Sequence, residues 1–241
     1  MLSITKSYIK IRNFLDDCIF GKKIKFLHIG KTGGTFIKDN LKFIDKKHRI
    51  RILPHSESIL KNDKHQYIFF VRNPIDRFIS AFWSRYRKGK PRYYSEWNKK
   101  EKEVFEFFKT PNDLAEAIYS SENIKKEKAK IALENISHLN MDLAFYLKDI
   151  KNIESCLNNI YYVGRQETIN DDLNKIIDKL GYDIEVRKKI KHDEITKHKT
   201  SEQFKNLSKI SNKGIVNIKK YYSKDFEIIE FLEKMQLIKK I

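Results

Sequence analysis

The chain has 241 residues, 40% of them hydrophobic, so it can bury the core of one domain that spans residues 1–241. Its 50 lysines and arginines outnumber its 32 acidic residues and give a formal net charge of +18, which favours polyanionic partners such as nucleotides, acidic glycans, nucleic acid or an anionic membrane surface. The two cysteines, Cys18 and Cys156, lie far apart, which excludes a disulfide framework or a zinc site built on cysteine pairs.

The N-terminal segment mixes apolar and charged residues. Residues 1–20 predict an amphipathic helical extension, because they lack the apolar stretch and the small-residue cleavage site of a signal peptide. The chain contains no apolar run of the length that crosses a bilayer, so the sequence predicts no transmembrane helix. Residues 24–29 then form a short apolar run between lysines and a glycine, which predicts the first buried strand of a parallel sheet.

A glycine-rich turn, Gly-Lys-Thr-Gly-Gly-Thr-Phe at residues 30–36, follows this strand. Glycines let the backbone turn tightly with its N–H groups pointing inward, the start of a helix adds partial positive charge, and Lys31 supplies a cation. The turn therefore predicts a site for a phosphate-like anion. A Walker A loop requires a glycine five residues before Gly30, and Lys25 stands there, so the turn departs from the usual nucleoside-triphosphate loop.

Two more strands are predicted before the next helix. Residues 35–43 are compatible with a helix, residues 50–53 with a short strand ending at Pro54 and His55, and residues 67–71 with a strand rich in aromatic and β-branched side chains.

A helix is predicted to begin at Pro74, since Asn73 is a good N-cap and Asp76 is an acidic residue in the first turn. Apolar residues recur there at helical spacing and predict a buried stripe, with polar residues on a different face. The stripe consists of Ile75, Phe78, Ile79 and Phe82, and the polar face of Arg77, Ser80 and Ser84.

The remaining chain is predominantly helical. Helices are predicted at 101–108, 110–119, 123–136, 169–180, 201–209 and 212–231, and a late strand at 160–163. Strands that alternate with helices predict an α/β, three-layer, P-loop-like domain with a central, mostly parallel sheet and a helix-rich C-terminal half. Ligands of such domains bind at the carboxyl ends of the strands, where the glycine turn and the Arg72 turn both lie.

Two segments carry a resemblance to a known family. His28 to Thr35, after a strand, resembles the loop by which sulfotransferases hold the 5′-phosphosulfate of 3′-phosphoadenosine 5′-phosphosulfate (PAPS). Residues 69–82 resemble the strand, turn and helix that grip the 3′-phosphate in that family. The two segments resemble in particular those of carbohydrate-type sulfotransferases with a Lys-Thr-Gly-Gly-Thr loop, bacterial members included, and the resemblance continues weakly through 163–167 and 221–226.

The resemblance assigns roles to individual residues. Lys31 would stabilise the leaving group at the oxygen between phosphate and sulfonate. Arg72 and Ser80 would contact the 3′-phosphate, for which the arginine fork is well suited. The full set of expected PAPS contacts is Lys31, Thr32, Gly33, Gly34, Thr35, Phe36, Arg72, Ser80 and Arg165. For the glycine turn, the alternative is a purely structural turn with a solvated Lys31. For Arg72 and Ser80, the alternative is a solvated helix face. Arg77 is equally compatible with a structural ion pair and with a cofactor contact.

His55 lies between the two motifs, where many sulfotransferases place a general-base histidine or glutamate. A histidine pKa of about 6.5 lets the side chain accept a hydroxyl proton near neutral pH. His55 is therefore the expected catalytic base, with Glu57 as the next candidate and a surface or core role as the alternative. Of the other histidines, His28 is expected to pack beneath the loop, and His48 and His65 to lie in loops. His138 is expected to be a satisfied residue at a helix end, with a place in the lining of the acceptor cleft as the alternative.

Two basic segments remain open. Residues 85–97 interleave arginines and lysines with aromatic residues, which is typical of either a solvated loop or a sugar-binding lip. Residues 187–199 are expected to lie at the surface.

The resemblance implies a PAPS-dependent sulfotransferase that transfers a sulfonate to a hydroxyl, with a carbohydrate as the expected acceptor, by in-line displacement and without a metal. Animal relatives usually carry a membrane anchor, so a chain without one fits a bacterial cytoplasmic enzyme or a chain from which an anchor was removed. One alternative is a P-loop kinase, which needs the missing glycine and an acidic Mg²⁺ ligand. A basic nucleic-acid-binding protein is the other, but the positive charge is dispersed and no binding motif is present, so no nucleic-acid partner is expected.

Overall fold

The computed structural model describes residues 24–48, 50–91, 93–181, 204 and 206–240. The predicted N-terminal helix at 1–20, the 187–199 segment and much of the predicted 201–209 helix lie outside the described residues.

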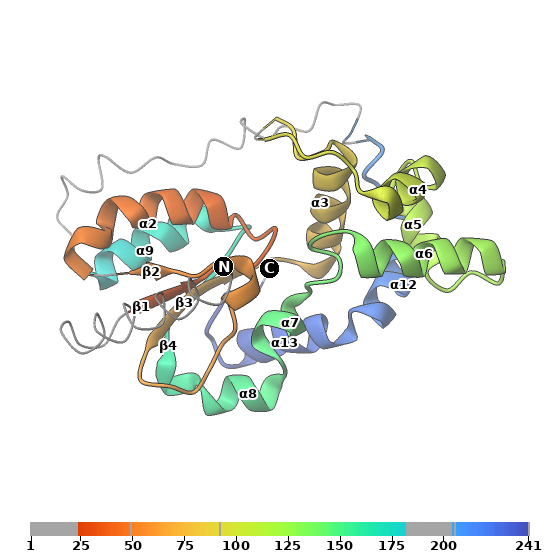
Figure 1. Ribbon diagram of the computed structural model, residues 1–241. Coiled ribbons are helices and arrows are strands. Elements are labelled where there is room, and N and C mark those ends of the chain that lie inside the picture. Colours follow the sequence, from red (N-terminus) through yellow and green to blue (C-terminus); the bar gives the residue numbers. More distant parts are fainter. Residues whose placement is uncertain (1–23, 49, 92, 182–203, 205, 241) are drawn as a thin grey trace, which may run out of the picture.

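The described residues form a four-stranded, entirely parallel sheet in the order β2-β1-β3-β4 (Figure 1). The strands are β1 (Ile24–Leu27), β2 (Arg51–Ile52), β3 (Gln66–Val71) and β4 (Ile160–Arg165). In register, Phe26 lies opposite Ile52, Leu27 opposite Phe69, and Val71 opposite Arg165. Since all four strands run the same way, their carboxyl ends meet at one edge, and the predicted parallel sheet is confirmed.

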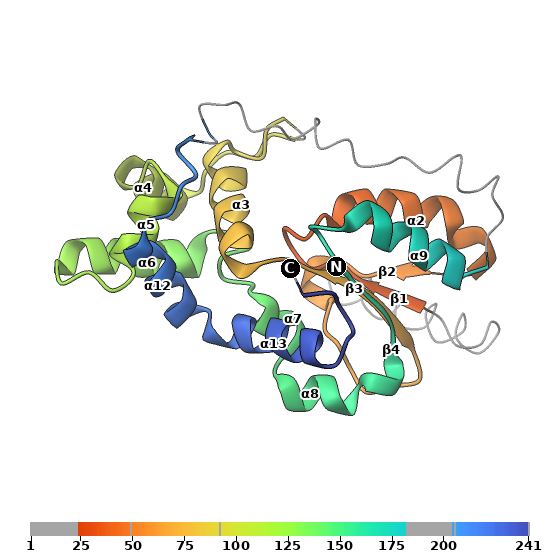
Figure 2. The same ribbon diagram turned by 180° about the vertical axis from the view of Figure 1, so that it is seen from behind.

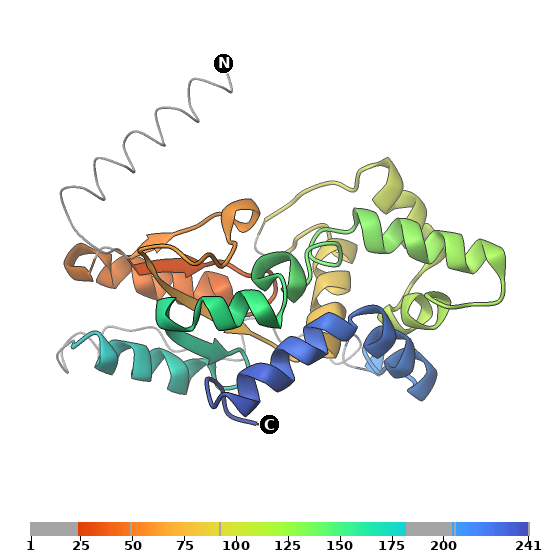
Figure 3. The ribbon, with the colours of Figure 1, turned by 90° about the horizontal axis from the view of Figure 1, so that it is seen from below.

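Helices cover both faces of this sheet, which confirms the predicted three-layer α/β fold. Successive strand side chains point to opposite faces, so Phe26, Ile68 and Phe70 pack under α2 (Gly34–His48) and α9 (Ile169–Lys179). On the other face, Leu27 and Phe69 pack against α7 (Leu143–Leu147), α8 (Ile150–Ser155) and α13 (Ser223–Lys234). Figures 2 and 3 show α2 and α9 on one side of the sheet, with α8 and α13 on the other.

The remaining helices form a lobe beside the sheet with a hydrophobic core of its own. They are α3 (Pro74–Tyr86), α4 (Lys99–Phe107), α5 (Pro111–Ala117), α6 (Asn123–Asn135) and α12 (Asn212–Tyr221). Asn73 caps α3 as predicted, because its side chain accepts the N–H of Ile75 at 2.9 Å. Asn98 with Glu101 and Thr110 with Asp113 form complete capping boxes at the starts of α4 and α5.

The C-terminal region differs from the single helix predicted over 212–231. It consists of α12 and α13, with Tyr222 between them in a non-helical backbone conformation. The buried Tyr222 hydroxyl donates to the carbonyl of Leu139 at 2.9 Å, and the Asp225 carboxylate accepts the N–H groups of Leu143 and Ala144 at 3.0 Å each. Two buried polar anchors therefore hold the chain at this break, and the short helix α7 that Asp225 caps was not predicted.

Two short 3₁₀ turns complete the described elements: η1 (His55–Glu57) after β2 and η2 (Leu157–Asn159) before β4. Turn η1 brings His55 to the edge at which the strands end.

Candidate active site

The glycine turn joins β1 to α2 at the carboxyl edge of the sheet. Lys31 and Gly33 both adopt the left-handed region, with φ of 69° and 78°. The Thr32 side chain is buried, and its hydroxyl donates to the carbonyl of Ile29 at 3.0 Å. Thr32 therefore fixes the turn from inside, while the backbone N–H groups of the turn, the start of α2 and the Lys31 side chain are groups of the kind that bind an anion.

The other predicted loop residues lie at the start of α2. Thr35 is partly exposed, whereas the ring of Phe36 packs against the core under α2 and α9. Phe36 is thus oriented by the hydrophobic core, so any contribution it makes to an anion site comes from its backbone.

Histidine rings lie so close to two positions of the turn, Gly30 and Gly34, that only glycine fits there. A Cβ atom at Gly30 would overlap Nδ1 of His138, and one at Gly34 would overlap the ring of His28. Any other residue at these positions would push an imidazole away from the turn. The loop and the histidines are consequently packed as one unit.

Three histidines from distant parts of the sequence form a row along this unit. The ring centroids of His28 and His55 are 4.0 Å apart, and those of His55 and His138 are 5.1 Å apart. Nδ1 of His55 and Nδ1 of His138 are both buried and have no hydrogen-bond partner in the part of the chain that the structure describes. His138 is therefore not the satisfied helix-end residue that the sequence predicts, because the fold places its ring over Gly30.

Burial keeps the imidazoles of His55 and His138 uncharged. Burial is the largest cause that lowers the pKa of His55. The positive charges of Lys31, Lys38 and Arg77 lower this pKa further, whereas a hydrogen bond to the His28 backbone raises it. Burial likewise lowers the pKa of His138 to about 3, and Lys31 contributes to the same direction. A neutral His55 can accept a proton, so its state suits a general base.

The turn is anchored from below by residues of the helical half. Nε of Arg77 donates to the carbonyl of Gly30 at 3.0 Å, and its Nη2 donates to the carbonyl of Met141. The Tyr146 hydroxyl accepts the N–H of Gly30 at 3.3 Å. Arg77 is 2% exposed, so this side chain of α3 is buried. The hydrogen bonds that its guanidinium makes hold backbone carbonyls, which favours a structural role for this residue.

Arg72, from the second motif at residues 69–82, contacts the glycine turn of the first motif. It follows β3, and its Nη1 donates to the carbonyl of Lys31 at 3.3 Å. Its Nε is buried without a hydrogen-bond partner among the described residues, and burial lowers its pKa. Ser80 is partly exposed on α3, three residues after Arg77 and so on the same side of that helix. Arg72 thus retains an unused donor beside the glycine turn.

Arg165 lies at the end of β4, but its Nη1 and Nε donors are occupied. Its Nη1 donates to Glu233 at 2.7 Å and to the carbonyl of Lys239 at 2.8 Å, and its Nε lies 3.5 Å from Glu167. These contacts tie α13 and the C-terminal residues to the sheet, and they give Arg165 a structural function that the sequence did not predict.

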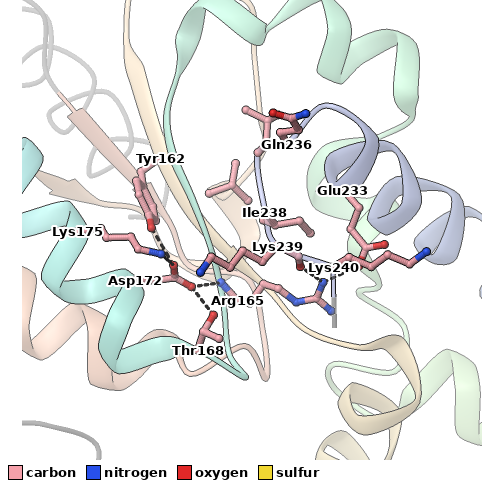
Figure 4. Close-up of a pocket in the computed structure, with 12 residues that line it drawn as sticks. Tyr162, Arg165, Thr168, Asp172, Lys175, Glu233, Gln236, Ile238, Lys239 and Lys240 are labelled. Atoms are coloured by element: carbon pink, nitrogen blue, oxygen red, sulfur yellow. Dashed lines mark hydrogen bonds and ion pairs between the residues drawn. The ribbon is translucent and has the colours of Figure 1, made fainter.

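Beside Arg165 lies a pocket of about 630 Å³, at the outer edge of the sheet (Figure 4). It is lined by Tyr162, Val163, Arg165, Thr168, Asp172, Lys175, Glu233, Gln236, Leu237, Ile238, Lys239 and Lys240. This lining includes neither the glycine turn nor the three histidines.

The basic stretch at 85–97 is largely held by its own contacts. Arg85 is buried and bonds Glu101 through two nitrogens at 2.6 and 2.7 Å. Lys88 pairs with Glu96 and lies 4.7 Å from the Trp97 ring centroid. Tyr93 and Tyr94 remain about half exposed, at 50% and 58%. The exposed part of this stretch therefore includes aromatic rings together with the exposed Lys90, whose Nζ lies 5.2 Å from the Tyr94 ring centroid.

Sequence reasoning did not find the parts of the site that come from the helical half. Met141 and Tyr146 lie far from both motifs in the sequence and carry no local pattern of their own. Ser58 lies between the two motifs and also carries no local pattern that marks it. Its hydroxyl accepts the N–H of His28 at 2.8 Å and donates to the carbonyl of Pro54 at 2.9 Å. Only tertiary packing brings these residues to the turn.

Across the described ranges, no group of three or more histidine, cysteine, aspartate or glutamate residues is arranged to hold a metal ion. None of the helices built from described residues has the length and apolar character needed to cross a bilayer.

Comparison with known proteins supports the resemblance seen in the motifs. The model of the Sulfotransferase family matches residues 21–231. The chain is also similar to human carbohydrate sulfotransferase 9, with 28% identity over 113 residues, which cover 46% of this chain and 24% of that protein. No solved structure matches the chain. Because the family match spans the glycine turn, Arg72 and all four strands, the chain belongs to the sulfotransferase family.

Proposed function

We propose that this enzyme transfers the sulfonate of PAPS to a hydroxyl group of a carbohydrate. The observation that carries the proposal is the arrangement at the carboxyl edge of the sheet. There a glycine turn with Lys31, a donor of Arg72 and a neutral His55 lie together.

The residues present fit such a donor substrate. The backbone N–H groups of the turn and the start of α2 would hold the 5′-phosphosulfate, together with Lys31 and Thr35. Arg72 has a buried Nε without a partner among the described residues, which a 3′-phosphate oxygen would satisfy, and Ser80 would add a hydroxyl donor. Thr32, Phe36 and Arg165 would support this site by packing and hydrogen bonding within the protein.

The proposed reaction is an in-line displacement at sulfur. His55 takes the proton of the acceptor hydroxyl as its oxygen forms a bond to sulfur. The bond between sulfur and the bridging oxygen breaks, and its electron pair stays on the 5′-phosphate of the product 3′-phosphoadenosine 5′-phosphate. Lys31 stabilises the charge that develops there, and a positioned base contributes about 10²- to 10⁴-fold to the rate.

Three observations favour a carbohydrate acceptor. The similar human protein is a carbohydrate sulfotransferase. Tyr93 and Tyr94 expose aromatic rings of the kind that pack on sugar faces. The net charge of +18 attracts acidic polymers such as anionic glycans.

The structure gives a reason to reject the kinase alternative. Lys25, at the position of the first Walker A glycine, lies within β1, and its Nζ contacts Asp63, which precedes β3, at 3.3 Å. A phosphate loop that began there would have to replace part of a buried strand.

Binding of 3′-phosphoadenosine 5′-phosphate, ADP and a short DNA duplex, measured side by side, tests the proposal. We expect a clear preference for the first, and Arg72→Ala should remove most of that preference while leaving ADP affinity nearly unchanged. A preference for ADP would support a kinase instead, and a preference for DNA would support a nucleic-acid-binding protein.

A further inference from the structure

His138 belongs to the helical half of the sequence, yet its ring lies against the glycine turn. It follows α6, and a Cβ atom at Gly30 would overlap its Nδ1. The ring also meets His55 edge to face, with 5.1 Å between centroids. The fold therefore delivers this side chain to the place where β1 ends and the anion turn begins.

Two features of His138 destabilise the folded protein. Its backbone is left-handed, with φ of 71°, a conformation that is unfavourable for residues other than glycine. Its buried Nδ1 has no hydrogen-bond partner among the described residues, and an unpaired buried polar group also lowers stability. Strained and unsatisfied groups of this kind cluster at functional sites, where a ligand completes their bonding.

The charge state of His138 limits what it can do. With a pKa lowered to about 3, it is a neutral imidazole at pH 7, with one N–H donor and one acceptor nitrogen. It cannot act as an acid, but it can donate a hydrogen bond to an anion next to Lys31 without repelling that lysine. A neutral imidazole that polarises a reacting group is a known arrangement in enzymes.

We propose that His138 is a sulfonate-binding residue, which donates an imidazole N–H to the sulfonate held at the glycine turn. This inference rests on the proposed function. The position of the ring supports the sulfonate rather than the 3′-phosphate. His138 contacts Gly30 and the expected base His55, whereas Arg72 reaches the turn at the carbonyl of Lys31.

Comparison of two nucleotides that differ only in the sulfonate tests this role by binding alone. His138→Phe keeps a ring over Gly30 but removes the donor, and His138→Asn keeps a donor and tolerates the left-handed backbone. We expect the Phe variant to bind PAPS about 10- to 100-fold more weakly than the wild type while its affinity for 3′-phosphoadenosine 5′-phosphate is nearly unchanged. The Asn variant should recover most of the PAPS affinity.

Equal losses for both nucleotides in the Phe variant would show that the ring only packs the turn, and unchanged PAPS affinity would show that it binds no sulfonate. Either result overturns the inference. If the Phe variant does not fold, His138→Gly, which relieves the backbone strain, allows the same comparison. The proposed function fails on a separate observation, a wild-type chain that binds neither nucleotide more tightly than ADP.

Discussion

Lys31 holds a left-handed backbone at the position where the site needs a cation. That conformation costs a lysine about 1–2 kcal/mol, whereas glycine adopts it freely but loses more entropy on folding. Lys31→Gly should therefore leave the free energy of unfolding within about 1 kcal/mol of the wild type, because the two effects nearly cancel.

The same variant should lower turnover by about 10²-fold or more, since one preorganised donor to the leaving group is lost. Denaturant unfolding and turnover with PAPS measure the two effects separately. A Lys31→Gly chain with near-normal turnover would remove this lysine from the mechanism.

His55 is expected to act on the acceptor rather than on the nucleotide. His55→Ala should reduce turnover by about 10²-fold or more while the affinity for 3′-phosphoadenosine 5′-phosphate is preserved. Because burial lowers the pKa of His55, the wild-type rate should persist somewhat below pH 6.5 and fall only when this imidazole becomes charged. If His55→Ala keeps most of its activity, the exposed Glu57 on η1 is the next base to test.

At the scale of elements, the helical half holds the active-site turn through a few buried polar contacts. Asp225 on α13 accepts two N–H groups at the start of α7, the helix that carries Tyr146. Asp225→Ala leaves these N–H groups unpaired and should lower the free energy of unfolding by about 2–4 kcal/mol. Glu227→Ala, at an exposed position of the same helix, is the matched control and should change it by less than about 0.5 kcal/mol.

Chemical denaturation of both variants measures these differences. Equal stability of the two would mean that α13 does not depend on the Asp225 contacts.

The sequence predicts those elements whose signals are local. Residues 24–29 and 67–71 became β1 and β3 because both are continuous apolar runs, and Asn73 caps α3 as its sequence suggests. The break at Tyr222 and the place of His138 could not be predicted. Each depends on a partner far away in the sequence, Leu139 for the tyrosine hydroxyl and Gly30 for the imidazole.

At the scale of the whole molecule, the buried histidines make stability depend on pH. His138 has a pKa of about 3 when folded and about 6.5 when unfolded, so the unfolded chain binds an extra proton between these values. The contribution of His138 to the free energy of unfolding is therefore complete above pH 6.5 and declines as the pH falls toward 3. Asp225 has the opposite effect on stability. Burial raises its pKa to about 6, so the folded state binds the extra proton and the contribution of Asp225 to stability decreases as the pH rises toward 6.

The His138 contribution is isolated by comparison with His138→Asn. The wild type should lose more unfolding free energy than this variant between pH 6.5 and pH 4, as measured by denaturant unfolding at each pH. Parallel pH curves for the two chains would show that the imidazole is not held neutral by burial.

The central claim is that this fold transfers a sulfonate from PAPS to a glycan hydroxyl, and a double-label transfer assay tests it most directly. The enzyme is incubated with desulfated glycosaminoglycans and either PAPS labelled in its sulfonate or ATP labelled in its γ-phosphate. We predict that the sulfonate label enters the polysaccharide with the wild type, that it does not do so with Lys31→Gly, and that the phosphate label stays in ATP. Transfer of the phosphate label, with none of the sulfonate label, would contradict the account.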